Sequence, residues 1–324
     1  MLDLDYLRYR QKKKKLVFAY NHNQISKEEF REKKKNLQKE RILKKCRLGV
    51  AYNLFDGEEL LEASILSIRS VASYIAVVWQ KVSNFGEQAN PKLEELLTRL
   101  KNQGLIDELY LYQPKFNQKQ KTYNERCKRD IGLQLVRKAG CNYFLSMDTD
   151  EFYHAHQIED ALCYIHKHKI NTSAVSIIEY LKKPTYQIVN GYTFSPTEFG
   201  KDFVFYCPFI MKVYHFKKQL HGLSNFPCLT DPIRTLNNRG KFYLFSKHLV
   251  VMHHMSTIRT DLTKKYKNSN LRKGENKDSD IFQLKEDILS YQYRQNLVEL
   301  SLFNGLYVQK VPNVFNISIT KEKT

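Results

Sequence analysis

The sequence predicts an α/β protein built on a mostly parallel sheet with helices on both faces. Two observations carry this prediction. Between residues 47 and 152, short apolar runs alternate with helical patterns, which is the element order of parallel sheets. The 324 residues are 42 % hydrophobic and 13 % aromatic, enough for a buried core. Outside this region we expect a basic helical hairpin at residues 1–46 and a mixed α+β region at residues 153–324, so the length divides into more than one structural unit.

The first element is the predicted hairpin. Residues 6–20 favour one helix, residues 21–24 a turn, and Ser26 with Glu29 three positions later forms a capping box that starts a second helix. The stretch ISKEEFREKKKNL resembles the short helical hairpins (SHOCT-like) attached to many bacterial proteins. That resemblance implies a tethering or oligomerisation element, so self-association is one role we expect here.

Four apolar runs then predict strands. The clearest is YIAVVW, whose β-branched and aromatic residues favour extended backbone. Each run is short and bounded by polar or turn residues, as buried strands of a parallel sheet are. The predicted strands span residues 48–52, 74–79, 108–112 and 142–147.

Three helical patterns separate these strands. Asn90 and Pro91 predict the start of the second helix, and Thr122 with Glu125 predicts a capping box for the third. The second and third patterns each end at a glycine, a common helix terminator. Their apolar faces are, in chain order, Leu61, Ile65, Ile68 and Ala72; then Leu93, Leu96, Leu97 and Leu100; then Cys127, Ile131 and Leu135.

The second half of the chain is less regular and more aromatic. It contains strand-like runs at residues 174–178, 203–214 and 242–252, a polar and basic stretch at 260–280, a helical pattern near 281–302, and a short run at 307–311. We interpret this half as an acceptor-binding region built onto the sheet.

Charge and composition restrict the class of protein. The formal net charge is +19, and residues 1–47 hold 16 Lys and Arg against 6 Asp and Glu. This asymmetry favours an anionic partner, either nucleic acid or an acidic membrane surface, unless it is a solvated helical face. No run approaches the roughly 18 apolar residues of a membrane-spanning helix. The N-terminus lacks the apolar core of a signal peptide, and the six cysteines lack metal-type spacing, so we expect reduced thiols and a cytoplasmic protein.

The strongest chemical signal is FLSMDTDEFY. Asp148 and Asp150 follow a buried strand directly, so they emerge at the carboxyl edge of a parallel sheet, where ligands bind. Carboxylate oxygens suit Mg²⁺ or Mn²⁺, whose remaining ligands are typically substrate phosphates. The motif therefore predicts a site that holds a diphosphate through a metal ion. The alternative is an acidic loop at the end of a strand.

Residues 48–152 resemble the GT-A glycosyltransferases, near the family 2 group and its metal-using relatives. The matching features are the first strand ending at Asn53, the helix at 58–70, the strand YIAVVW, the basic helix from Asn124, and the MDTDE motif. The resemblance implies a nucleoside-diphosphate sugar donor. It departs after the second strand, where Gln80 and Lys81 replace the acidic turn common in family 2, and no late Glu-Asp pair for the catalytic base is evident.

A histidine pair supports the same prediction. His253 and His254 end a strand and precede a basic segment with Arg259, Lys264 and Lys265. In several GT-A families a histidine after the D-x-D completes the metal site, and the resemblance implies the same here. Adjacent side chains on a strand point to opposite faces, so we expect one of the two to face the ion, with His254 favoured. The cations can balance the leaving diphosphate. A structural role is the alternative for both histidines.

Donor-binding and catalytic candidates come from the remaining polar residues. The resemblance implies that one of the basic residues at the start of the third helix contacts the donor, unless they form a solvated face. Three carboxylates are rival candidates for the general base that deprotonates an acceptor hydroxyl. The donor-binding candidates are Asn53, Arg126, Arg129, Asp148, Arg259 and Lys265, and the general-base candidates are Asp231, Asp202 and Glu198.

The sequence thus predicts a glycosyltransferase that uses Mn²⁺ or Mg²⁺ and moves a sugar from a nucleoside diphosphate to a glycan or glycolipid. We expect a role in bacterial surface polysaccharide assembly (lipopolysaccharide, lipooligosaccharide or capsule) at the inner face of the cytoplasmic membrane. Two alternatives stand beside it. A nucleotidyltransferase would need a better phosphate loop than residues 53–57, and a nucleic-acid-binding protein would be expected to contain a recognisable binding module, which the sequence lacks.

Overall fold

The computed structural model describes residues 4–116, 122–189, 206–214, 231, 233–234, 240–267, 277–293, 297–298 and 306–319. Its central sheet has the strand order β3-β2-β1-β4-β9. The first four strands are parallel and the short β9 is antiparallel. The predicted α/β fold is confirmed. The strands are β1 (Leu48–Leu54), β2 (Tyr74–Trp79), β3 (Glu108–Leu111), β4 (Tyr143–Asp148) and β9 (Met211–Lys212).

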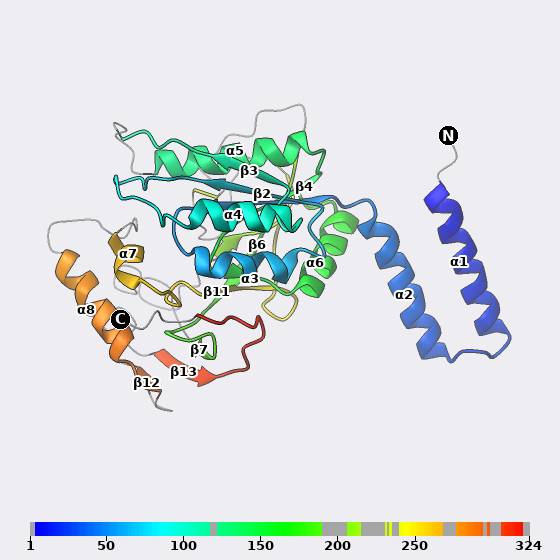
Figure 1. Cartoon of the computed structure of the whole chain (residues 1–324). Coiled ribbons are helices and arrows are strands. Elements are labelled where there is room, and N and C mark those ends of the chain that lie inside the picture. Colours follow the sequence, from blue (N-terminus) through cyan, green and yellow to red (C-terminus); the bar gives the residue numbers. More distant parts are fainter. Residues whose placement is uncertain are drawn as a thin grey trace.

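Helices cover both faces of this sheet because its strands are apolar on both sides (Figure 1). Val50, Val77 and Leu145 pack into the larger core, with residues of three helices. Ala51 and Phe144 point to the other face and pack beneath a single helix. The first group of helices is α3 (Glu58–Ile68), α4 (Leu93–Asn102) and α6 (Ala155–His168), and the single helix is α5 (Tyr123–Lys138).

Helix α5 lies unusually close to the sheet. A Cβ atom on Gly132 would be 2.5 Å from the Cβ of Ala51, so only glycine allows this approach. Since α5 leads into the parallel strand β4, its first turns lie at the carboxyl edge of the sheet. That placement brings Lys128 and Arg129 to the candidate site, and both are buried rather than forming a solvated basic face.

A second sheet stands beside the first and is built from distant parts of the chain. Its order is β10-β6-β11-β5, and β8 also pairs with β6. The antiparallel pairing of β5 with β11 places His254 opposite Glu151, and the parallel pairing of β6 with β11 places His254 opposite Glu179. The strands are β5 (Glu151–Phe152), β6 (Thr172–Glu179), β8 (Tyr206–Pro208), β10 (Phe242–Leu244) and β11 (Val251–His254).

The C-terminal part adds a small third sheet, in the order β12-β13-β7, and two helices. Helix α7 follows β11 and reaches back to the edge of the central sheet through Lys265. The elements are β7 (Tyr186–Val189), α7 (Leu262–Lys267), α8 (Lys277–Ser290), β12 (Leu297–Val298) and β13 (Leu306–Lys310).

Several predicted boundaries were wrong for local reasons. Helix α4 begins at Leu93 because the side chain of Asn90 accepts a hydrogen bond from the Lys92 N–H and closes a turn before the helix. The run at 203–214 forms two strands in different sheets, since Pro208 has no N–H to continue the ladder. The run at 242–252 is likewise divided between β10 and β11. Helix α8 ends at Ser290, earlier than predicted, and the Thr122 side chain makes no capping bond.

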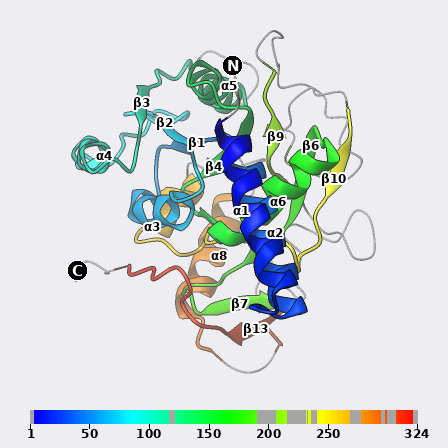
Figure 2. The same ribbon diagram turned by 90° about the vertical axis from the view of Figure 1, so that its right-hand side faces the viewer.

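The N-terminal hairpin projects from the body of the protein (Figures 1 and 2). Helices α1 (Leu4–Asn21) and α2 (Lys27–Leu43) form it, and Ser26 caps α2 by accepting a hydrogen bond from the Glu29 N–H, as predicted. Lys39 joins α2 to α6 through ion pairs to Glu159 and Asp160, each 2.9 Å. Helix α1 lies on the outer side of α2, where Lys12 pairs with Glu40.

Two expectations concern composition rather than topology. Within the described residues, no helix combines the length and apolar character needed to cross a membrane. The five cysteines in that part of the chain are free thiols, and Cys228 lies outside it.

Candidate active site

A polar cleft of about 180 Å³ lies at the carboxyl edge of the central sheet. Strands β2 and β3 extend the sheet to one side of β1, and β4 extends it to the other, so the cleft lies where the direction of the strand order reverses. Open α/β sheets bind ligands at this position. The lining residues are Asn53, Phe55, Asp56, Gln80, Ser83, Asn84, Glu125, Lys128, Asp148, Thr149, Asp150, His254, Arg259 and Lys265.

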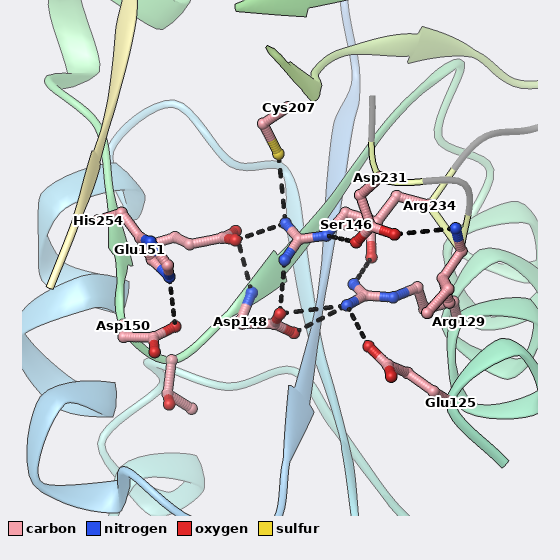
Figure 3. Close-up of polar contacts among 12 residues, drawn as sticks. Glu125, Arg129, Ser146, Asp148, Asp150, Glu151, Cys207, Asp231, Arg234 and His254 are labelled. Atoms are coloured by element: carbon pink, nitrogen blue, oxygen red, sulfur yellow. Dashed lines mark hydrogen bonds and ion pairs between the residues drawn. The ribbon is translucent and has the colours of Figure 1, made fainter. Parts of the chain in front are cut away.

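Asp148 ends β4 and is held by two arginines (Figure 3). Nη2 of Arg129 donates to both carboxylate oxygens at 3.1 Å, and Nη2 of Arg234 donates to Oδ2 at 2.5 Å. Burial alone would raise the pKa of Asp148, but the two guanidinium groups outweigh it and lower the pKa to about 2. Asp148 is therefore ionised and fixed in orientation at neutral pH.

Asp150 is 2 % exposed and carries two cations on one oxygen. Nη2 of Arg259 lies 2.5 Å from Oδ2, and Nζ of Lys265 lies 2.8 Å from the same atom. Burial opposes ionisation, yet Lys265 and Arg259 hold the pKa of Asp150 well below its usual range. Gly57 makes room for the arginine, because a Cβ there would overlap Nη1 of Arg259.

Arg234 links three carboxylates at the inner wall of the site (Figure 3). Besides Asp148, it contacts Glu151 through Nη1 at 2.5 Å and Asp231 through Nε at 3.0 Å. Glu151 also accepts a hydrogen bond from the Asp148 N–H at 3.1 Å. Burial raises the pKa of Glu151 to about 7 despite this arginine. Arg234 thus ties the loop that carries Asp231 to the D-T-D motif.

The two histidines lie on opposite sides of β11. Nδ1 of His253 is 2.8 Å from the hydroxyl of Tyr180, and its ring packs against Phe315, away from the cleft. Burial lowers the pKa of His253 to about 4. His254 faces the cleft, with Nδ1 2.7 Å from Glu179 and Nε2 3.8 Å from Oδ1 of Asp150.

The protonation of His254 makes the free energy of unfolding depend on pH. Burial alone lowers its pKa, but the carboxylates of Glu179 and Asp150 raise it to about 9, above the value of about 6.5 in the unfolded chain. The resulting stabilisation is fully present below about pH 6.5 and is lost as the pH rises through 9.

We therefore expect the free energy of unfolding to fall by about 3 kcal/mol between pH 6.5 and 9 in chelator, and His254→Gln to remove most of this slope. Urea unfolding at several pH values measures it. The exposed His248 provides the control His248→Gln, which should keep the wild-type slope. Equal slopes in all three proteins would contradict the assignment.

Oδ1 of Asp150 and Nε2 of His254 are the atoms that a divalent ion at this site would use. Nδ1 of His254 is occupied by Glu179, which is the usual arrangement for a metal-ligating histidine, and Nε2 faces Oδ1 of Asp150. Among the described residues no three His, Cys, Asp or Glu side chains converge on one point. An ion held by Asp150 and His254 would therefore take further ligands from substrate phosphates, and it would displace the His254 proton. Mn²⁺ or Mg²⁺ stays a prediction.

The structure brings most of the sequence candidates together. Asp148, Asp150, His254, Arg259 and Lys265 line one cleft. Asn53 joins them, because with its amide oxygen turned toward Arg129 it accepts hydrogen bonds at 2.9 and 3.2 Å. Four others differ: Arg126 does not line the cleft, His253 lies away from it, and Glu198 and Asp202 lie outside the described residues.

Three residues of the site had no assigned role in the sequence analysis, namely Glu151, Glu179 and Arg234, whereas Lys128 was one of the basic residues expected to provide a donor contact. Glu151 belongs to the D-T-D-E motif, so its proximity was readable from the chain. Arg234 lies three residues after Asp231, and the sequence indicates this proximity but not the contacts of Arg234 with Asp148 and Glu151. Glu179 meets His254 only through the pairing of β6 with β11, and no sequence signal marks it.

Comparison with known proteins leaves the family open, since no protein-family model and no curated protein matches the chain. Solved structures of S. aureus TarS, a glycosyltransferase, are similar to it in fold. One has a TM-score of 0.38 at 11 % identity and covers 76 % of this chain and 44 % of that chain. A structure of TarS 1-349 has a TM-score of 0.37 at 11 % identity and covers 74 % and 71 %. The same fragment in complex with UDP-GlcNAc has a TM-score of 0.29 at 13 % identity and covers 48 % and 38 %. The chain thus spans less than half of the first of these structures.

Proposed function

We propose that this protein is a glycosyltransferase that binds a nucleoside-diphosphate sugar in the polar cleft and transfers the sugar to an acceptor hydroxyl. One observation carries the proposal. Two ionised carboxylates, Asp148 and Asp150, stand at the point where the strand order reverses, and cationic side chains share the cleft with them. This combination suits a donor with a diphosphate and neighbouring hydroxyl groups.

Different residues of the cleft would have different roles in sugar transfer. Lys265 carries a positive charge next to the position where the diphosphate would develop negative charge as the sugar leaves. Asp148, fixed by Arg129 and Arg234, offers carboxylate oxygens to donor hydroxyls. A divalent ion held by Asp150 and His254 would supply further neutralisation of the diphosphate.

Three carboxylates are candidates for the general base. Asp231 is joined to the site through Arg234 and is partly exposed, so it is accessible to an acceptor. Glu198 and Asp202 stay equal rivals from the sequence. An acceptor hydroxyl would give its proton to one of these carboxylates while its oxygen bonds to the sugar C1 and the C1–diphosphate bond breaks.

A panel of nucleotide sugars tests the proposal directly. Ligands that bind only the folded state raise the unfolding midpoint, so the correct donor should raise it, and more strongly with Mn²⁺ than with chelator. Release of nucleoside diphosphate in the presence of an acceptor extract would follow. Pyrophosphate release from a nucleoside triphosphate would instead indicate the nucleotidyltransferase, and steeply salt-dependent binding to arbitrary DNA a nucleic-acid-binding protein.

We further propose that the N-terminal hairpin holds the enzyme at an anionic membrane surface, where a glycolipid acceptor of a bacterial surface polysaccharide would lie. Helix α1 carries Arg8 and Lys12–Lys15, all exposed. Only Lys12 of these is used in an ion pair, to Glu40, within the described residues. Each basic residue near an acidic lipid surface contributes about 1 kcal/mol to membrane binding.

Replacing Lys13, Lys14 and Lys15 by glutamine should therefore weaken binding to vesicles that contain phosphatidylglycerol by about 3 kcal/mol, roughly 100-fold. Co-sedimentation measures it, with pure phosphatidylcholine vesicles as the reference. A variant with Lys101, Arg137 and Lys138 changed to glutamine removes the same charge from the body of the protein and should bind like wild type. If both variants bind equally, the hairpin serves another purpose, such as self-association.

A further inference from the structure

One buried cation in the cleft has no ion-pair or hydrogen-bond partner among the residues that the structure describes. Lys128, on α5, is 6 % exposed and lines the cleft. Its ammonium makes no hydrogen bond or ion pair with the described part of the chain. Every other cation of the site is paired: Arg129 and Arg234 with Asp148, and Arg259 and Lys265 with Asp150.

The carboxylates nearest to Lys128 are already engaged. Glu125 and Asp148 lie close enough to act on its charge, but both accept hydrogen bonds from Nη2 of Arg129. A desolvated ammonium without a compensating partner destabilises a folded protein. This residue therefore weakens the ligand-free protein, and a bound anion would remove that cost.

A second ammonium lines the same cleft. Lys265, on α7, lines the same cleft and keeps about a quarter of its side chain exposed. Its charge and that of Lys128 both interact with the carboxylate of Asp148, so the two ammonium groups share the part of the cleft around this residue. An anion with oxygens on two phosphorus atoms can contact two such cations at once.

We propose that Lys128, together with Lys265, binds the diphosphate of the donor nucleotide. This inference rests on the proposed function, because it assumes that a nucleoside diphosphate enters the cleft. It assigns the diphosphate to cations of α5 and α7, in addition to any ion held by Asp150 and His254. It also explains why the sequence keeps an unpaired charge in a buried position.

The test compares Lys128→Met, Lys128→Arg and Lys138→Met in the full chain. Lys138 lies at the exposed far end of the same helix, so its variant is the matched control. UDP, GDP, CDP and ADP are screened by thermal shift with wild type. The diphosphate that binds, and its nucleoside, are then titrated calorimetrically into each variant at fixed Mn²⁺.

We expect Lys128→Met to weaken diphosphate binding about 10–100-fold, the loss of one charge-assisted hydrogen bond, and to leave the nucleoside affinity within about two-fold. Lys128→Arg should retain part of the affinity, and Lys138→Met all of it. Without ligand, Lys128→Met should unfold at the wild-type temperature or above, since the unpaired charge is gone.

Four results would overturn the inference. Wild-type diphosphate affinity in Lys128→Met would do so while the proposed function stands. Equal loss of diphosphate and nucleoside binding, or a lowered unfolding temperature without ligand, would assign Lys128 a structural role. If wild type binds none of the four diphosphates, both this inference and the proposed function fail.

Discussion

Replacing Asp150 by asparagine should reduce sugar transfer on the order of 10²–10³-fold, the usual effect of losing a preorganised electrostatic contact. Asp150 holds Arg259 and Lys265 on one carboxylate oxygen, and its other oxygen faces His254. The amide keeps the shape but not the charge, so the two cations lose their anchor. Any divalent ion would lose a carboxylate ligand as well.

Steady-state kinetics with the donor found in the panel measure this loss, well below the unfolding temperature of the variant. Asp160→Asn is the control, because Asp160 of α6 pairs with Lys39 of α2 and does not line the cleft. Calorimetry with Mn²⁺ separates two causes of failure. Loss of ion binding supports a metal role, and full transfer by Asp150→Asn would remove the D-T-D motif from the chemistry.

Arg234→Ala should lower the free energy of unfolding by about 3–5 kcal/mol, the cost of breaking a buried ion pair by removing one partner. This side chain is 8 % exposed and contacts Asp148, Glu151 and Asp231. Without it, Glu151 stays buried without its guanidinium partner. Urea unfolding at about pH 8, above the pKa of about 7 of Glu151, gives the difference.

Arg99→Ala provides the comparison, since the exposed pair of Arg99 with Glu62 should contribute less than about 1 kcal/mol. The expected order is therefore a large loss for Arg234 and a small one for Arg99. At a pH low enough to protonate Glu151, the loss in Arg234→Ala should become smaller because one uncompensated charge disappears. Equal losses for the two arginines would show that the network around Arg234 adds no stability.

The strands of the central sheet were predictable because each is a short apolar run with polar residues at its ends. Residues 74–79 were predicted with the observed bounds, and β4 was displaced by one residue. Boundaries set by side-chain hydrogen bonds were less predictable. Asparagine is a common helix-capping residue, yet the side chain of Asn90 closes a turn before the helix instead.

The sequence by itself determined that the chain forms a parallel sheet and that Asp148 and Asp150 stand at its carboxyl edge. Local rules suffice for this, because strand composition and the order of elements set where the strand ends. It also determined that His253 and His254 face opposite ways, since side chains alternate along a strand. None of these features depends on contacts between distant parts of the chain.

Only the tertiary structure decided which charges meet. Glu179 reaches His254, and Arg234 reaches Asp148 and Glu151, across 75 to 86 residues of chain. The same holds for burial: Lys128 and Arg129 are charged, but the close packing of α5 on β1 buries both, Lys128 in the wall of the cleft and Arg129 against Asp148. Such pairings depend on the register of β5, β6 and β11, which long-range packing selects and which leaves no periodic pattern in the sequence.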